Sequence, residues 1–277
     1  MEHATASRLI GLAPLTCLEL TPLELVRTAQ ANGFDFVGVR LIPGSEQEVR
    51  HDMRVGSPML REVCAVLRDT GLVVLDVEVF RLLPQTDVLA FEPVLAAAQA
   101  MGAREALVVG QDPDRGRLAA RFGQLCELAA RHGVTANLEP LPWADVKTLA
   151  DAAQVLSRAG CETAGILLDT LHFDRVGGVS RDIAAIDPRW FRYCQLCDAP
   201  PERPTDLDTL LFQARCERLM PGDGGIDLRS VIGALPATLP ISLEIPMHAW
   251  ARNANAQTRT REMLDRTRRW LAGNSGV

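Results

Sequence analysis

Residues 115–140 read RGRLAARFGQLCELAARHGVTANLEP, and they contain one complete helix-and-strand unit. Its first part, Arg115–His132, is an amphipathic segment that ends at Gly133, a typical helix stop. The run Val134–Pro140 follows at once, and its alternating apolar and polar residues predict a β-strand. The apolar residues 134, 136 and 138 would face one side, and Thr135, Asn137 and Glu139 the other. The stretch therefore predicts a helix and a strand that ends on a carboxylate.

The same unit recurs along the whole chain. Strand-like runs followed by helical or irregular stretches start 25 to 49 residues apart. They are Leu9–Pro14, Phe34–Ile42, Val73–Phe80, Glu105–Gly110, Val134–Pro140, Ala164–Asp169, Phe191–Asp198 and Pro240–Pro246. Eight such units in about 250 residues close a (β/α)8 barrel, so we expect an α/β protein with a single TIM-barrel domain over residues 1–277. An open, doubly wound parallel sheet is the alternative.

Helix signals fill the gaps between these runs. Thr21-Pro22-Leu23-Glu24 is a capping box with proline at the first helical position, and its helix ends at Gly33. Other amphipathic segments also stop just before a glycine, and one closes the chain. They are Ser57–Thr70, Leu89–Met101, Arg115–His132, Ala144–Ala159 and the last, Thr258–Leu271. The only lysine, Lys147, falls on the exposed face of one of these expected helices, which argues against Schiff-base chemistry.

Composition excludes several classes of protein. The chain has a net charge of −6 and no basic tract, which argues against nucleic acid as a partner. No run approaches the roughly 18 apolar residues of a membrane span, and Met1–Ser7 lacks the features of a signal peptide. Seven scattered cysteines indicate reduced thiols, and the pair Cys194 and Cys197 would point to opposite faces of a strand. We therefore expect a cytoplasmic protein that does not contact a membrane.

Polar residues end four consecutive strands. By the strand alternation, Glu139, Asp169 and Glu244 point inward at the carboxyl ends of their strands, and Gln195 lies at the same height. Buried carboxylates so close together repel one another, and a divalent cation is the simplest neutraliser. Oxygen ligands of this kind suit Mg²⁺ or Mn²⁺ better than Zn²⁺. The competing interpretation is that each acid makes an ordinary cap or salt bridge.

These residues carry a resemblance to a known family, and the resemblance covers nearly the whole chain. The sequence resembles the sugar phosphate isomerase/epimerase superfamily, the xylose-isomerase-like barrels. The matching stretches are Asn137–Trp143, Leu167–His172, Gln195–Pro200, Leu219–Asp227 and Ser242–Pro246. The resemblance implies one metal ion held by Glu139, Asp169, Gln195 and Glu244, with His172 beside it. Many epimerases of this family have histidine where this chain has Gln195, and the Gln variant looks closer to the dehydroshikimate dehydratase branch.

The expected chemistry is proton abstraction next to a carbonyl through a metal-stabilised enediolate of a polyhydroxylated small molecule. Glu139 and Glu244 would act as base and acid, which predicts an isomerase or epimerase. If His172 instead protonates a β-hydroxyl group, the same enolate expels water and the enzyme is a dehydratase, a carbon–oxygen lyase. The sequence does not choose between them.

Four further residues are candidates for substrate binding. Arg40 and Glu78 point inward on neighbouring strands, where a salt bridge between them is an equal alternative. Arg218 fits the family position for a substrate-binding arginine, and His248 follows the last strand. The glycine loop at residues 222–225 favours a turn over a phosphate site, because Asp223 would repel a phosphate.

Two other functions are alternatives to an isomerase, epimerase or dehydratase. An apurinic endonuclease shares the barrel, but its trinuclear zinc site needs many more than five histidines. A non-catalytic sugar-binding barrel would be expected to have lost a metal-ligand position, and none is lost here. Barrels of this family are often dimers or tetramers, which leaves a homo-oligomer open.

Overall fold

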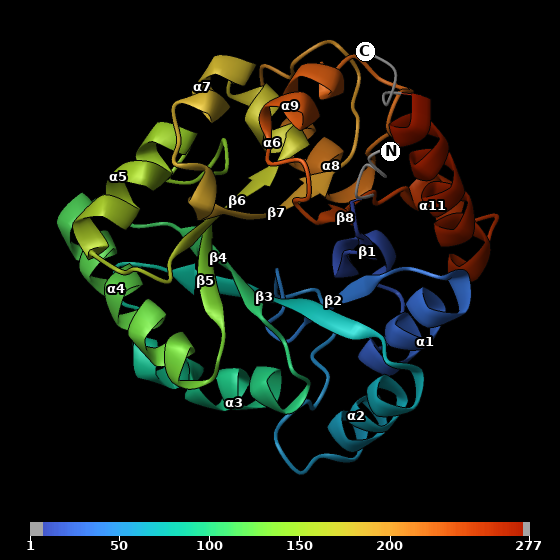
Figure 1. Cartoon of the computed structure of the whole chain (residues 1–277), viewed down its shortest axis with the longest axis horizontal. Helices are drawn as coiled ribbons and strands as arrows, with labels where there is room; N and C mark the ends of the chain where they lie inside the picture. Colours follow the sequence, from blue (N-terminus) through green and yellow to red (C-terminus); the bar gives the residue numbers. More distant parts are fainter. Residues whose placement is uncertain (1–7, 274–277) are drawn as a thin grey trace, which may run out of the picture.

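Eight parallel strands form a closed barrel surrounded by helices in the computed structural model, which describes residues 8–273 (Figure 1). The strands are β1 (Ile10–Leu12), β2 (Phe36–Arg40), β3 (Val73–Leu82), β4 (Glu105–Gly110), β5 (Thr135–Glu139), β6 (Gly165–Asp169), β7 (Phe191–Leu196) and β8 (Ile241–Leu243). The barrel closes where β1 pairs with β8, with Ile10 opposite Ile241 and Leu12 opposite Leu243. The predicted TIM barrel is confirmed. Met1–Ser7, on which the expectation of no signal peptide rests, lies outside the described residues.

The helices follow the strands in chain order. They are α1 (Pro22–Asn32), α2 (Pro58–Thr70), α3 (Glu92–Ala100), α4 (Arg115–Arg131), α5 (Leu149–Ala159), α6 (Thr170–Arg175), α7 (Ser180–Ala184), α8 (Leu207–Cys216), α9 (Leu228–Ala234), α10 (His248–Ala251) and α11 (Ala256–Gly273). Single 3-10 turns lie at Pro14–Cys17, Val88–Phe91 and Pro188–Trp190. Along residues 8–273, no helix is both long and apolar enough to cross a membrane.

Local sequence signals set most helix ends. The Thr21 hydroxyl accepts a hydrogen bond from the Glu24 backbone N–H, and the Glu24 carboxylate accepts one from Thr21 N–H, as the capping box predicted. At the carboxyl end of α2, Gly71 adopts a left-handed backbone conformation with a φ of 72°, which residues other than glycine rarely adopt. The sequence therefore places these boundaries to within a residue.

One helix prediction was wrong at its start. Residues 144–147 form a loop, and α5 begins only at Leu149. Thr148 and Asp151 form a second capping box, which starts the helix five residues later than expected and leaves Lys147 exposed on the loop. The expected helix at 89–101 is also divided, because a 3-10 turn precedes α3.

The alternation of the strands separates two apolar layers. Outward side chains such as Val37, Leu138 and Ile166 pack under the helices in the larger core. The smaller core lies inside the barrel and includes Leu107, Leu167 and Tyr193. Large side chains fit inside because small residues face them.

Gly11 on β1 shows how tight this inner packing is. A Cβ on Gly11 would lie 2.0 Å from Cε2 of the Phe36 ring. The Phe36 ring therefore occupies the space that any larger residue at position 11 would need.

The cysteines of the Cys194–Cys197 pair, one on β7 and one just after it, make different contacts. Cys194 and Cys197 are both buried in the outer core, so the expectation that they point to opposite faces was wrong, because Cys197 lies beyond the end of the strand. All seven cysteines are free thiols, and the Cys197 thiol packs against Thr170 and Arg218.

Candidate active site at the carboxyl ends of the strands

The four predicted metal ligands lie at one end of the barrel. Glu139 and Asp169 are the last residues of β5 and β6, Gln195 is on β7, and Glu244 directly follows β8. Each side chain is buried, with at most 4% of any of these residues exposed. Asp169 lies opposite Gln195 in the sheet register, which places their side chains at the same level of the barrel. The structure thus brings together the residues that the strand alternation predicted.

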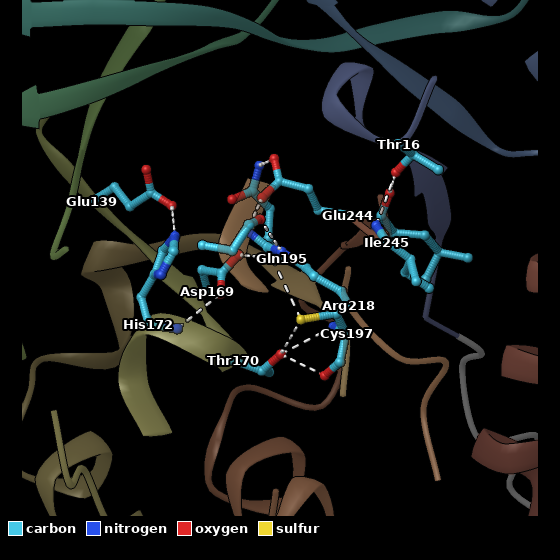
Figure 2. Close-up of polar contacts among 12 residues, drawn as sticks. Thr16, Glu139, Asp169, Thr170, His172, Gln195, Cys197, Arg218, Glu244 and Ile245 are labelled. Carbon is cyan, nitrogen blue, oxygen red and sulfur yellow. Dashed lines mark hydrogen bonds and ion pairs between the residues drawn. The ribbon is translucent and has the colours of Figure 1, made fainter. Parts of the chain in front are cut away.

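His172 lies against this cluster because α6 begins directly after β6. The Asp169 carboxylate caps α6 by accepting a hydrogen bond from the His172 backbone N–H, at 3.0 Å. The His172 ring then lies with Nε2 3.9 Å from Glu139 Oε1 (Figure 2). The edge of Trp143 packs on the imidazole, with ring centroids 4.9 Å apart. The predicted proximity of His172 to the acids is therefore present.

Arg218 is the central cation of the cluster in this structure (Figure 2). Its guanidinium donates to Asp169 Oδ2 at 2.6 Å and forms an ion pair with Glu244 Oε2 at 2.7 Å. Gln195 also donates to Glu244, from Nε2 to Oε1 at 2.8 Å. The Arg218 side chain is only 1% exposed, so its charge acts on these carboxylates with little screening by water.

The protonation of the site follows from burial and from Arg218. Burial, together with the charge of Asp169, raises the pKa of Glu139 well above its usual range. Burial also raises the pKa of Glu244 to about 8, although Arg218 opposes this. Burial acts in the same direction on Asp169, but Arg218 and His172 outweigh it and lower the pKa of Asp169. Without a metal ion, one carboxylate is therefore firmly ionised and paired with the guanidinium.

His172 is neutral in this environment. Burial is the largest effect and lowers the pKa of His172 to about 4, although Asp169 favours the charged form. A neutral imidazole can accept a proton or ligate a metal ion.

The side chains fit a divalent cation. Ligand atoms of Glu139, Asp169 and His172 all lie within 4.8 Å of one another. Gln195 Oε1 and His172 Nδ1 are buried and have no hydrogen-bond partner among residues 8–273. Carboxylate and amide oxygens suit a hard cation, and cation binding would displace protons from the two glutamates. Arg218 already neutralises part of the cluster, so the carboxylates are not unpaired, contrary to what the sequence alone suggested.

A cleft of about 410 Å³ opens above these residues. Glu139, His172, Arg218 and Glu244 contribute to its lining, and so do the substrate-binding candidates Arg40 and His248. The fourth candidate, Glu78, does not line the cleft. It is fully buried and pairs with Arg40 at 2.6 Å, which is the salt bridge weighed from the sequence.

The glycine loop is a turn held by an internal carboxylate. The backbone N–H groups of Gly222, Gly224 and Ile226 all donate to the carboxylate of Asp198, at 3.0 to 3.1 Å. The N–H groups that would bind a phosphate are thus already occupied, in agreement with the prediction of a turn.

Several cleft residues were not predicted from the sequence, among them two arginines. Arg81 lines the cleft from β3, and Arg215 lines it from α8. The sequence signal for Arg81 was its place just beyond the inward residue Glu78. Helix α8 lies in the proline- and glycine-rich stretch 199–225, where the sequence predicted only a long loop, so nothing marked Arg215.

The fold and this cluster define a TIM barrel with a buried acidic site at the carboxyl ends of its strands. The chain belongs to the xylose isomerase-like TIM barrel family, whose model matches residues 26–270. The family resemblance read from the sequence is therefore confirmed.

Known proteins similar to this chain include enzymes of two reaction classes. A 3-dehydroshikimate dehydratase of Pseudomonas aeruginosa PAO1 is 32% identical over 154 residues, which are 53% of this chain and 24% of that protein. The chain thus matches only about a quarter of that relative's length. The structure of 3-keto-D-glucoside 4-epimerase from E. coli is 18% identical, covers 95% of this chain and 99% of that chain, and has a TM-score of 0.68. A structure of IOLI protein with a zinc atom is 16% identical, covers 93% and 95%, and has a TM-score of 0.74. The last two similarities show the fold alone.

Proposed function

We propose that this chain is a metal-dependent dehydratase that removes water from a cyclic hydroxyketone, and that 3-dehydroshikimate is its substrate. The cleft carries this proposal. His172, which we assign to proton transfer, and the adjacent Glu139 stand beside an apolar surface formed by Val79, Leu107 and Val109. An apolar surface suits the face of a carbon ring, whereas an open-chain polyol would leave hydroxyl groups against it without partners.

Two further observations support a dehydratase over an epimerase. The 3-dehydroshikimate dehydratase of Pseudomonas aeruginosa PAO1 is a relative with 32% identity over 53% of this chain. Gln195 also stands where many epimerases of the family have histidine, and here it hydrogen-bonds to Glu244. Neither observation depends on the shape of the cleft.

The substrate's own chemistry matches this site. 3-Dehydroshikimate has a ketone, a hydroxyl on the adjacent carbon and a second hydroxyl on the next carbon. Removing the proton beside the ketone gives an enolate, and this enolate can expel the second hydroxyl as water. The product of this elimination is a cyclohexadienone, and it becomes aromatic when a proton leaves the remaining ring CH2 group and the ketone oxygen gains one. The formation of the aromatic ring makes the overall reaction favourable.

His172 is the residue we assign to move the proton. Its neutral imidazole accepts the proton from the carbon beside the ketone, and the resulting imidazolium returns that proton to the departing hydroxyl on the same face. Glu139, 3.9 Å from Nε2, stabilises the imidazolium between these two events. The sequence argument gave His172 only the second of these roles.

Glu139, Asp169, Gln195 and Glu244 are the residues that would hold the metal ion, Mn²⁺ or Mg²⁺. When bound, such an ion supplies Lewis acidity toward a carbonyl oxygen. Arg218 keeps Asp169 ionised and oriented for that purpose through the contact at 2.6 Å. The Trp143 ring packs nearly perpendicular to the imidazole of His172, at an interplanar angle of 86°, and so restricts the orientation of the imidazole.

The test is to incubate the purified protein with 3-dehydroshikimate and Mn²⁺ or Mg²⁺, and to follow the aromatic product by ultraviolet absorbance. We expect turnover that His172→Gln and Glu139→Gln each reduce by roughly 10² to 10⁴, the usual contribution of general acid–base groups. His132→Gln is the matched control, because His132 contacts Glu92 and Gln99 outside the cleft and should retain full turnover.

The isomerase or epimerase expected from the sequence predicts a different result. In that case the protein would exchange solvent deuterium into a keto-sugar with no loss of water, and 3-dehydroshikimate would give no aromatic product. This outcome would refute the dehydratase.

A further inference from the structure

Two arginines at the cleft have no carboxylate partner. Arg81 and Arg215 both line it, and neither has an Asp or Glu oxygen within 4.0 Å among residues 8–273. The other cleft arginines are paired, Arg40 with Glu48 and Glu78, and Arg218 with Asp169 and Glu244. The cleft therefore has two guanidinium groups that form no direct ion pair within the described part of the chain, although the carboxylates of Glu48 and Glu78 act on Arg81 from a longer distance.

Arg81 is held in a fixed position by backbone oxygens. Its guanidinium donates to the carbonyl oxygens of Pro43 at 3.2 Å and Gly44 at 2.8 Å. These bonds fasten it to the loop between β2 and α2 without neutralising it. Burial, together with the like charges of Arg40 and Arg215, lowers the pKa of Arg81, although Glu48 and Glu78 oppose this.

Arg215 is positioned by an aromatic ring. Its guanidinium carbon lies 5.9 Å from the centroid of Trp143, within the range of a cation–π contact. The same tryptophan packs on His172, with centroids 4.9 Å apart. The charge of Arg215, an exposed residue, thus lies on the side of Trp143 near the residue that we assign to proton transfer, and it contributes to lowering the pKa of His172.

An anion bound in the cleft would give Arg81 and Arg215 the direct ion-pair partner that each of them lacks. Guanidinium groups recognise carboxylates by charge-assisted hydrogen bonds. A phosphate is the other oxyanion they bind, but the loop where barrels of this kind bind phosphate is already filled by the Asp198 carboxylate. The closed loop favours a carboxylate.

We propose that Arg81 and Arg215 bind a carboxylate of the substrate and so orient its ring over His172. This inference rests on the proposed function in one respect, since it takes the substrate to be a cyclic hydroxy acid. It adds that the enzyme discriminates against uncharged ketones of the same shape. This selectivity for a carboxylate comes from Arg81 on β3 and Arg215 on α8, and not from the acidic cluster.

Binding of a ligand that cannot react separates this inference from the proposed function. Shikimate lacks the ketone and so cannot undergo the elimination, and its methyl ester has the same ring without the charge. We expect calorimetry to show shikimate binding roughly tenfold to a hundredfold more tightly than the ester, the usual effect of a charged hydrogen-bonded group. Arg81→Gln and Arg215→Gln should each reduce the ratio of the affinity for shikimate to the affinity for its ester. Arg81→Lys should reduce this ratio less than Arg81→Gln.

Arg189→Gln is the matched control, because Arg189 is exposed and pairs with Asp187 outside the cleft. It should leave the difference between the two ligands unchanged. Equal binding of shikimate and its ester, or a difference that both Arg→Gln variants retain, would overturn the inference. Ribulose 5-phosphate binding more tightly than shikimate would also overturn it, in favour of a phosphate. If shikimate shows the expected pattern but 3-dehydroshikimate is not dehydrated, the carboxylate site stands and the proposed reaction falls.

Discussion

Arg218→Gln tests the electrostatics of the acidic cluster most directly. The variant removes a guanidinium that is 1% exposed and leaves Asp169 and Glu244, whose side chains are 0% and 5% exposed, without a cation. Removing one partner of a buried ion pair costs about 3 to 5 kcal/mol. Because the pKa of Glu244 is already raised to about 8, this side chain can take up a proton, and only Asp169 is left as an unpaired charge.

The cost should therefore lie near the lower limit, about 3 kcal/mol. For a domain of this size that corresponds to a fall in melting temperature of roughly 6 to 12 °C. The assay is thermal unfolding at neutral pH in EDTA, followed by circular dichroism, and then repeated with Mn²⁺. Because a bound cation would replace the lost positive charge, we expect Mn²⁺ to stabilise the variant more than the wild type.

The matched control is Arg175→Gln. Arg175 is also 1% exposed and is held by Asp174 and by Gln213, but it lies outside the cleft lining. This variant should lose stability without any added response to Mn²⁺. The reasoning is wrong if Arg218→Gln in EDTA melts within about 2 °C of the wild type, or if Mn²⁺ stabilises both variants equally.

Three further predictions concern the barrel itself. Burial raises the pKa of Asp76 well above its unfolded value, so the folded state retains a proton that the unfolded state releases, and the free energy of unfolding falls as pH rises through that window. Asp76→Asn should therefore stabilise the protein more at about pH 8 than at about pH 4, and equal stabilisation in urea titrations at both would contradict this. Gly11→Ala should destabilise by roughly 1 to 3 kcal/mol in urea unfolding, because its Cβ would meet the Phe36 ring, whereas an unchanged midpoint would show that the ring moves aside freely. Native thiol titration with Ellman's reagent should reach no more than the partly exposed Cys64, Cys161 and Cys216, and all seven after denaturation; rapid reaction of a fourth thiol in the native protein would refute the burial.

The sequence predicted the barrel because its signals are local. In β5 and β6, inward and outward side chains alternate regularly enough to assign Glu139 and Asp169 to the interior. In a closed barrel, inward side chains at the carboxyl ends of the strands lie close together. Even the late start of α5 was present in the sequence, since Thr148-Leu-Ala-Asp151 has the pattern of a capping box.

The contacts of Arg218 could not be predicted in the same way. They depend on how the chain returns to the barrel after α8, through isolated bridges that pair Asp198 with Leu219 and Glu217 with Met247. Such pairings join residues 21 to 30 positions apart in no regular pattern, so no periodicity reports them. The fixed places of Arg81 and Arg215 depend on similar contacts, with backbone oxygens and with Trp143.

Asp198 has a consequence for the speed of ligand binding. By accepting hydrogen bonds from Gly222, Gly224 and Ile226, it orders the loop that follows Arg218 within the folded chain itself. The loop therefore loses its conformational entropy during folding and not when a ligand arrives. Association should then proceed in one kinetic phase, limited by entry into the cleft and not by closure of this loop.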